Sequence, residues 1–341
     1  MPGPLLDVLR GANLRPRPLW LMRQAGRYLP EYRELRAKKG GFLELVHDSE
    51  AAAEITLQPV RRFGFDGAIL FSDILVVPNA MGQELAFLDG EGPRLSPRLA
   101  DHSLEVLKAV PDRLEPVYET VRMVKRQLGS ATTLLGFAGS PWTVASYMVA
   151  GEGSRDQHAA RELAYRDPAG FEAIIEAVRA VTVEYLSRQI AAGAEAVQLF
   201  DSWAGSLAPA EFERWVTAPT AEIVRQIHER HPGLPVIGFP KGAGEKLVAY
   251  ARKTKVDAVG IDETIDPIWA ARALPENLPV QGNLDPLLLL ADGGELERQV
   301  HRILEAFSGR PHIFNLGHGI GPATPIAHVE RLVDLVREWQ G

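Results

Sequence analysis

The chain has 341 residues, of which 46% are hydrophobic and 24% charged, a composition typical of a folded globular protein. Its formal net charge of −7 at pH 7 disfavours a protein that coats DNA or another large polyanion. Cysteine is absent, which excludes disulfides, thiolate nucleophiles and cysteine-ligated zinc or iron–sulfur sites.

Residues 1–18 contain no long apolar stretch and include Asp7, so they do not resemble a secretory signal. No apolar run approaches the roughly 18 residues that a membrane span needs. We therefore expect a cytoplasmic protein that binds neither membrane nor nucleic acid.

Short apolar runs alternate with longer amphipathic stretches along the whole chain. Eight runs are predicted strands: Pro18–Met22, Asp66–Ser72, Thr133–Ala138, Ala196–Asp201, Pro235–Phe239, Ala258–Asp262, Pro279–Gly282 and His312–Leu316. Seven stretches are predicted helices: Ser49–Phe63, Leu114–Leu128, Phe171–Ala192, Pro209–Arg230, Gly244–Thr254, Glu295–Phe307 and Pro325–Trp339.

Helix-sized connections between successive strands favour parallel pairing, which predicts an α/β fold. Eight such strands favour closure into a (β/α)₈ TIM barrel that forms one domain, residues 1–341, with an N-terminal arm. An open doubly wound sheet is the alternative, but no predicted strand is followed by a G-x-G-x-x-G turn. The segment 84–98 (ELAFLDGEGPRLSPR) predicts a small hairpin inserted after the second strand.

Active sites of such barrels lie at the C-terminal ends of the strands. Polar residues and glycines follow every predicted strand, where they line a cleft or simply end the strand. They are Arg23 and Arg27, Ser72-Asp73, Gly139-Ser140-Pro141, Asp201-Ser202, Pro240-Lys241, Asp262-Glu263, Asn283-Leu284-Asp285 and Gly317-His318-Gly319.

The segment 10–39 is strongly basic, with nine basic and two acidic residues and hence a local charge of +7. Arg23 and Arg27 flank Gln24-Ala25-Gly26, where glycine lets the backbone approach a ligand. Two guanidinium groups at a barrel mouth predict a substrate that carries carboxylates or phosphates.

Three further residues have open roles. Asp73 lies between apolar runs, where a carboxylate either pairs with an arginine or accepts N–H groups and stabilises positive charge. His318 lies between two glycines and suits proton transfer or ligand contact, although a lone histidine often only packs. Lys241 is either a Schiff-base lysine or, as we favour, an exposed turn residue.

Five sequence blocks resemble the uroporphyrinogen decarboxylase family. They are MRQAGRYLPEYR at 22–33, FSDIL at 71–75, GFAGSPWT at 136–143, GNLDP at 282–286 and NLGHG at 315–319. The blocks extend from the first predicted strand to the last, so the resemblance covers essentially the whole chain. Ser140 and Ile320-Gly321-Pro322 depart from the usual family pattern.

The resemblance implies a homodimeric barrel that removes the four acetate carboxyls of uroporphyrinogen III, giving coproporphyrinogen III and four CO₂ in tetrapyrrole biosynthesis. It implies no cofactor and no metal. Matching motif positions imply that Asp73 is catalytic and that the substrate is bound by a set of eleven residues. These are Arg23, Gln24, Ala25, Gly26, Arg27, Arg36, Asp73, Tyr147, Phe200, Ser202 and His318.

Two other functions remain as alternatives. Corrinoid- and methionine-type methyltransferases share this barrel, but they typically use a zinc site with a cysteine ligand, which this chain cannot form. A tetrapyrrole carrier would keep the arginine-rich mouth without requiring Asp73.

Overall fold

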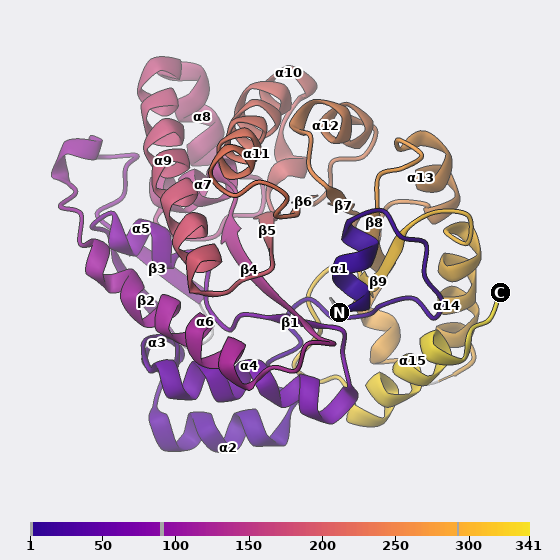
Figure 1. Cartoon of the computed structure of the whole chain (residues 1–341). Coiled ribbons are helices and arrows are strands. Elements are labelled where there is room, and N and C mark those ends of the chain that lie inside the picture. The colour runs from indigo at the N-terminus through magenta and orange to yellow at the C-terminus, as the bar shows by residue number, and fades with distance from the viewer. Residues whose placement is uncertain (1–2, 89–91, 292) are drawn as a thin grey trace.

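The computed structural model describes residues 3–88, 92–291 and 293–341, and its centre is a curled parallel sheet surrounded by helices (Figure 1). Seven strands lie in the order β1-β4-β5-β6-β7-β8-β9. Their bounds are β1 (Gly67–Ile69), β4 (Thr133–Gly139), β5 (Ala196–Asp201), β6 (Val236–Pro240), β7 (Ala258–Gly260), β8 (Val280–Leu284) and β9 (His312–Leu316). The prediction of a parallel α/β sheet is confirmed.

The predicted first strand, Pro18–Met22, forms one isolated bridge instead of a regular strand. Phe314 N–H donates to the Pro18 carbonyl at 2.9 Å, and Asp66 N–H donates to the Leu19 carbonyl at 2.9 Å. The segment therefore joins β9 to the chain entering β1 and closes the ring.

Side chains take up the amides that a full strand would use for its ladder. Leu19 N–H donates to Asp66 Oδ2 at 2.8 Å, and Leu21 N–H donates to Gln24 Oε1 at 3.1 Å. Met22 N–H donates likewise to Asn315 Oδ1 at 2.9 Å. These side chains compete with the strand ladder for the backbone amides, which the apolar character of the segment does not reveal. The competition explains why the predicted first strand is only a bridge.

Helices form the outer layer of the molecule (Figure 1). They are α1 (Pro4–Leu9), α2 (Pro30–Lys39), α3 (Phe42–His47), α4 (Ser49–Phe63), α5 (Val76–Ala80), α6 (Glu115–Gln127), α7 (Pro141–Ala150), α8 (His158–Arg166), α9 (Pro168–Ala192), α10 (Pro209–Phe212), α11 (Ala218–Arg230), α12 (Lys246–Thr254), α13 (Pro267–Ala273), α14 (Glu295–Ala306) and α15 (Ile326–Glu338). Short 3₁₀ turns occupy Leu104–Val106, Pro111–Leu114, Ala204–Ser206 and Pro286–Leu289. None of the helices in the described ranges is long and apolar enough to span a bilayer.

Local sequence signals explain where several helices begin and end. Asp48 caps α4 by accepting the Ala51 N–H at 3.0 Å, and Asp167 caps α9 by accepting the Gly170 N–H at 2.9 Å. The stretch predicted as one helix from Pro209 to Arg230 is helical throughout, and a π-helical turn at Glu213–Thr217 lies between α10 and α11.

The predicted hairpin is present as the antiparallel pair β2 (Glu84–Leu88) and β3 (Gly92–Ser96), with Glu84 opposite Ser96. Its turn lies outside the described residues. Leu95 N–H donates to the Gly151 carbonyl at 2.7 Å, so the hairpin is fastened to the end of α7.

A chain of polar side chains crosses the otherwise apolar interior of the barrel. Trp20 Nε1 donates to Gln281 Oε1 at 3.0 Å, and Gln281 Nε2 donates to Gln198 Oε1 at 3.0 Å. All three side chains are fully buried. Because an unsatisfied buried amide is costly, this series of hydrogen-bonded side chains fixes the relative positions of the closing segment, β5 and β8 beneath the site.

Candidate active site

Four of the predicted site residues lie close enough to interact electrostatically, although they come from distant parts of the sequence. Arg23 follows the closing segment, Asp73 follows β1, Tyr147 lies on α7 and His318 follows β9. The Arg23 charge influences the pKa of each of the other three groups. Ring closure therefore gathers the first, second, third and last loops around one arginine, as the C-terminal end of a barrel requires.

Asp73 is the carboxylate of this group. Burial raises its pKa, and the Leu75 N–H and the Arg23 guanidinium oppose that rise. Its Oδ1 accepts the Leu75 N–H at 2.8 Å, which orients the carboxyl at the start of α5. The arrangement presents a carboxylate in a largely apolar setting, where its charge interacts strongly with a bound cation.

The Arg23 charge lowers the pKa of Asp73 against the effect of burial, which predicts a pH effect on activity. Loss of the guanidinium in Arg23→Gln raises the Asp73 pKa further, so the acid limb of kcat/KM moves to higher pH. The measurement is the pH profile of kcat/KM for both proteins. Arg27→Gln serves as the control, since Arg27 is not among the groups that act on Asp73. A limb that stays in place or moves to lower pH in Arg23→Gln contradicts the coupling.

The last loop packs tightly against two other loops because two of its residues are glycines: Gly319 lies against the first loop and Gly317 against the loop after β7. A Cβ on Gly319 would lie 2.3 Å from Arg23 Cδ, and one on Gly317 would lie 2.2 Å from the Glu263 backbone nitrogen. Arg23 itself has φ 60°, a left-handed conformation that costs a non-glycine residue about 1 kcal/mol or more. The tight packing and the strained backbone mark this junction as functionally constrained.

His318 lies between those two glycines and is neutral. Burial and, to a smaller extent, the charges of Arg23 and Lys241 lower its pKa to about 3, against the opposing charge of Asp262. A neutral imidazole at pH 7 offers one N–H donor and one acceptor, but it does not carry an extra proton to deliver. The geometry therefore favours hydrogen bonding to a ligand over proton donation.

Tyr147 stands against Trp203, a neighbour that the sequence analysis did not single out. The two ring centroids are 6.1 Å apart. Burial raises the Tyr147 pKa, and the Asp73 charge raises it further, so the phenol stays protonated and can donate a hydrogen bond. Trp203 directly follows Ser202, and this position after β5 is the only sequence signal that could have found it.

The loop after β5 is held by a buried polar cluster. Thr143 Oγ1 donates to Asp201 Oδ1 at 2.5 Å and accepts the Trp203 N–H at 3.1 Å. Phe200, next to this cluster, packs edge-on against Phe137 at 5.6 Å. Ser202, between Asp201 and Trp203, is partly exposed.

Asp201 is 1% exposed, and burial raises its pKa to about 7. Because the native pKa lies above the value near 3.9 of an unfolded aspartate, its contribution to stability is lost as the pH rises from about 4 to about 7. In Asp201→Asn this loss is absent. We expect the Tm of the variant minus the Tm of the native protein to increase by several degrees as the pH is raised from about 5 to about 8. Thermal unfolding at each pH measures this, and a constant Tm difference would show that Asp201 stays ionised.

The other members of the predicted binding set form two groups. Arg27 and Arg36 both influence the Tyr32 pKa, which burial raises, and so they lie beside Tyr32 and not beside Asp73. The Tyr32 ring contacts Phe71 edge-on, with the ring centroids 5.9 Å apart, so Arg27 and Arg36 border the Asp73 loop.

Gln24 has a supporting place. It is completely buried, and its Nε2 donates to the Gly67 carbonyl at 2.9 Å. Ala25 and Gly26, which follow it, are partly exposed. Gln24 therefore fastens the first loop to β1.

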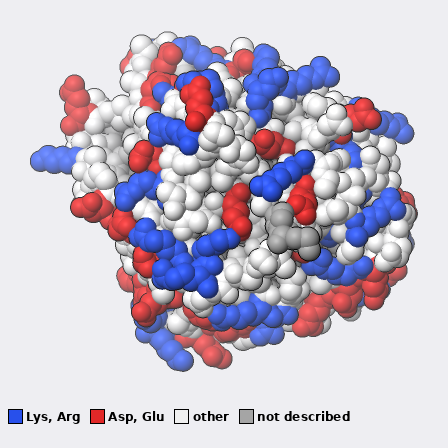
Figure 2. All heavy atoms as spheres, in the orientation of Figure 1, with Lys and Arg blue, Asp and Glu red and all other residues white. Residues whose placement is uncertain are grey.

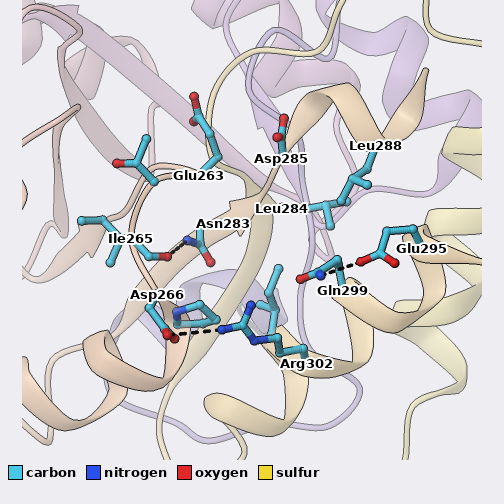
Figure 3. A pocket seen from close by; sticks show the side chains of 13 residues that line it. Glu263, Ile265, Asp266, Asn283, Leu284, Asp285, Leu288, Glu295, Gln299 and Arg302 are labelled. Carbon is cyan, nitrogen blue, oxygen red and sulfur yellow. Dashed lines mark hydrogen bonds and ion pairs between the residues drawn. The ribbon is translucent and has the colours of Figure 1, made fainter. Parts of the chain in front are cut away.

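Two hollows lie beside the loops after β7, β8 and β9, and His318 lines the smaller of them. One, of about 410 Å³, lies between the loops after β7 and β8 and α14, with Asn283 on its wall and the Asp266–Arg302 ion pair across it (Figure 3). The other, of about 290 Å³, is lined by Glu263, Asp285, His318 and Gly319 among others. No group of three or more His, Asp or Glu side chains in the described ranges is placed to hold a metal ion.

Charge on the rest of the surface is mixed. Basic and acidic side chains are interspersed over the face in Figure 2, and many of them form ion pairs such as Arg225 with Glu222. The positive charge of Arg23, Arg27 and Arg36 is therefore a local feature of the first loop and α2.

Fold and site together define a class: a parallel α/β barrel whose C-terminal end combines a half-buried carboxylate with several cations, as an enzyme acting on a small polyanion requires. The family model described as "Uroporphyrinogen decarboxylase (URO-D)" matches residues 3–339. The chain belongs to this family.

Individual relatives agree. The chain is 72% identical over 339 residues to a uroporphyrinogen decarboxylase of Novosphingobium aromaticivorans, covering 99% of each chain. It is 70% identical over 334 residues to a uroporphyrinogen decarboxylase of Rhizorhabdus wittichii, covering 98% of this chain and 97% of the relative.

Solved structures with a similar fold include a methyltransferase from Methanosarcina mazei, with a TM-score of 0.82, 19% identity and coverage of 99% and 98% of the two chains. A B12-independent methionine synthase from Shewanella sp. has a TM-score of 0.59, 12% identity and coverage of 96% and 94%. At these identities the likeness concerns the fold alone.

Proposed function

We propose that this chain is a uroporphyrinogen decarboxylase that converts the four acetate groups of uroporphyrinogen III to methyl groups, releasing four CO₂. The observation that carries the proposal is the meeting of Asp73, Arg23 and Tyr147 at the barrel mouth in a chain of this family. Sequence relatives at 72% and 70% identity bear this name, whereas the methyltransferases resemble the chain in fold only.

The chemistry needs an electron sink, because cleavage of the acetate C–C bond leaves an electron pair behind. Protonation of the pyrrole at the carbon that bears the acetate gives a cationic ring. The ring accepts the electron pair as CO₂ leaves, and protonation of the side-chain carbon then gives a methyl group. Loss of the first proton from the ring carbon restores the neutral pyrrole, so each acetate exchanges one CO₂ for one proton. Asp73 stabilises the cation by accepting hydrogen bonds from the pyrrole N–H groups, an interaction that strengthens as positive charge develops. The substrate is its own electron sink, so the scheme requires no cofactor.

Uroporphyrinogen carries eight carboxylates, which explains a basic first loop on an acidic protein. Arg23, Arg27 and Arg36 are the cations that pair with them. Hydrogen bonds come from the protonated Tyr147 phenol, Ser202 and the neutral His318, while Phe200 offers an apolar face to the macrocycle. Ala25 and Gly26 line the approach, and Gln24 holds their loop.

The test is anaerobic incubation of the purified protein with uroporphyrinogen III, followed by measurement of CO₂ and chromatography of the porphyrins after oxidation. Coproporphyrinogen and CO₂ in a 1:4 ratio are expected. Binding without CO₂ release would instead indicate a tetrapyrrole carrier. Failure to bind the tetrapyrrole would contradict both functions.

We also propose that the chain acts as a single catalytic domain, as a homodimer, in the cytoplasm. The support is the resemblance of the sequence to its family. Sedimentation equilibrium of the purified protein tests the dimer, and a monomer at micromolar concentration would contradict it.

A further inference from the structure

Lys241, the residue directly after β6, has a backbone that is fixed from three sides. Its N–H donates to the Asp201 carbonyl at 3.0 Å, and its carbonyl accepts the Gly205 N–H at 2.9 Å. The next amide, that of Gly242, donates to Asp262 Oδ2 at 2.7 Å. The loops after β5, β6 and β7 are thereby joined at this lysine, so its position is rigid.

The Lys241 ammonium, in contrast, is held loosely. Its Nζ lies 3.6 Å from Glu263 Oε1 and donates no hydrogen bond within the described part of the chain. The lysine–carboxylate pairs formed by Lys39, Lys125 and Lys253 have N–O distances of 2.8 to 2.9 Å. A rigid backbone with a loosely held cation is typical of a group placed for an additional partner.

Glu263 is also incompletely satisfied. Its Oε2 is buried and has no hydrogen-bond partner among the described residues. Such an oxygen is costly, because burial removes its water without replacing it. Glu263 cannot move far from the site, since its backbone nitrogen lies against Gly317.

The pair lies at the edge of the substrate site. Lys241 is close enough to lower the His318 pKa together with Arg23, and Glu263 and His318 line the same hollow of about 290 Å³. In Figure 3, which shows the larger hollow, the side chains of Glu263 and Asp285 point away from Asn283. A carboxylate that entered this hollow would be repelled by Glu263, whose Oε1 lies 3.6 Å from the Lys241 ammonium.

We propose that Lys241 is a further substrate-binding residue: its ammonium pairs with a carboxylate of the polyanionic substrate, and Glu263 occupies the lysine in the substrate-free protein until that carboxylate replaces it. The proposal rests on the proposed function for the nature of the substrate. It also explains the loose pair, because a strong Lys–Glu bond would compete too well with the substrate. A fourth cation, on the side of the mouth opposite α2, spreads positive charge around a macrocycle whose carboxylates extend in all directions.

The test uses Lys241→Met and Glu263→Gln, with the dissociation constant for uroporphyrinogen measured anaerobically by quenching of tryptophan fluorescence, for which Trp203 lies in the site. Lys241→Met is expected to raise Kd about tenfold through loss of a charge-assisted hydrogen bond. Glu263→Gln is expected to lower Kd about threefold by removing the competing charge. The effect of Lys241→Met should shrink as salt is added, because a partly exposed pair is screened.

A matched control exists on the outer layer. Lys253 and Glu213 form an ion pair of the same residue types at 2.9 Å, away from the loops of the site. Lys253→Met and Glu213→Gln should leave Kd within about twofold. Circular dichroism and Tm measurements verify that all four variants are folded; should Lys241→Met fail to fold, Glu263→Gln alone decides.

Opposite shifts in Kd for the two site variants support the proposal. Equal shifts, or none, overturn it and leave the pair as a structural tie between the loops. The failure of the proposed function is distinguishable: wild-type protein that binds uroporphyrinogen but releases no CO₂ contradicts the decarboxylase activity, and the Kd comparison still decides the role of Lys241. Wild-type protein that does not bind uroporphyrinogen overturns both.

Discussion

Replacing Asp73 with asparagine is expected to lower kcat/KM by about a thousandfold, which corresponds to about 4 kcal/mol of transition-state stabilisation. Asparagine keeps an oxygen to accept the Leu75 N–H, so the turn at the start of α5 is preserved. What is lost is the negative charge, and its absence matters most when the pyrrole becomes cationic. Burial raises the cost of the ionised carboxyl and also strengthens its interaction with that cation.

The measurement is steady-state decarboxylation of uroporphyrinogen by native protein and Asp73→Asn. Asp266→Asn is the matched control, because Asp266 Oδ1 accepts the Ile268 N–H at 2.8 Å in the same two-residue turn and lies away from Arg23. The control should retain activity within about threefold. A loss below about tenfold, or 1.4 kcal/mol, in Asp73→Asn would exclude it as the main electrostatic group.

Gly317→Ala is expected to have the second large effect, this time on both stability and activity. The added Cβ would lie 2.2 Å from the backbone nitrogen of Glu263 and 2.7 Å from its Cα, atoms that no rotamer change can move away. Backbone displacement of this kind costs about 3 kcal/mol. It also shifts His318, the next residue, so kcat/KM should fall by about a hundredfold.

Urea unfolding and the decarboxylation assay measure the two effects in the same preparation. Gly309→Ala is the control, since a Cβ there meets nothing within 4 Å and Gly309 has no left-handed backbone conformation. It should change stability by less than about 1 kcal/mol. If Gly317→Ala proves as harmless as Gly309→Ala, the last loop has more freedom than its packing shows, and the strict placement of His318 is contradicted.

Prediction from sequence succeeded where a signal is contained in a few neighbouring residues. The helix predicted at Ser49–Phe63 has those bounds, because Asp48 caps it and Gly64 ends it in a left-handed conformation. Prediction failed where two distant groups compete for the same atoms. The segment Pro18–Met22 is apolar enough for a strand, but Asp66, Gln24 and Asn315 bind its amides.

The candidate site divides in the same way. Motifs identified Asp73 and His318, each within its own block, and Tyr147 by its place shortly after the block at 136–143. The structure brings all three around Arg23. No motif placed Trp203 against Tyr147, since their contact depends on how α7 packs beside the loop after β5. Nor did a motif show that Arg27 and Arg36 gather at Tyr32.

The sequence by itself determined the alternation of strands and helices, the family and the sign of charge that a substrate must carry. It also determined that no thiolate chemistry is possible, since the chain contains no cysteine. The tertiary structure alone decided which of the many polar loop residues meet. Closure of the ring by one bridging segment sets the distances between loops far apart in sequence, and those distances pair Lys241 with Glu263 and set Arg23 against Gly319. Local periodicity carries no information about them, because it describes how a segment faces the core and not which other segment lies beside it.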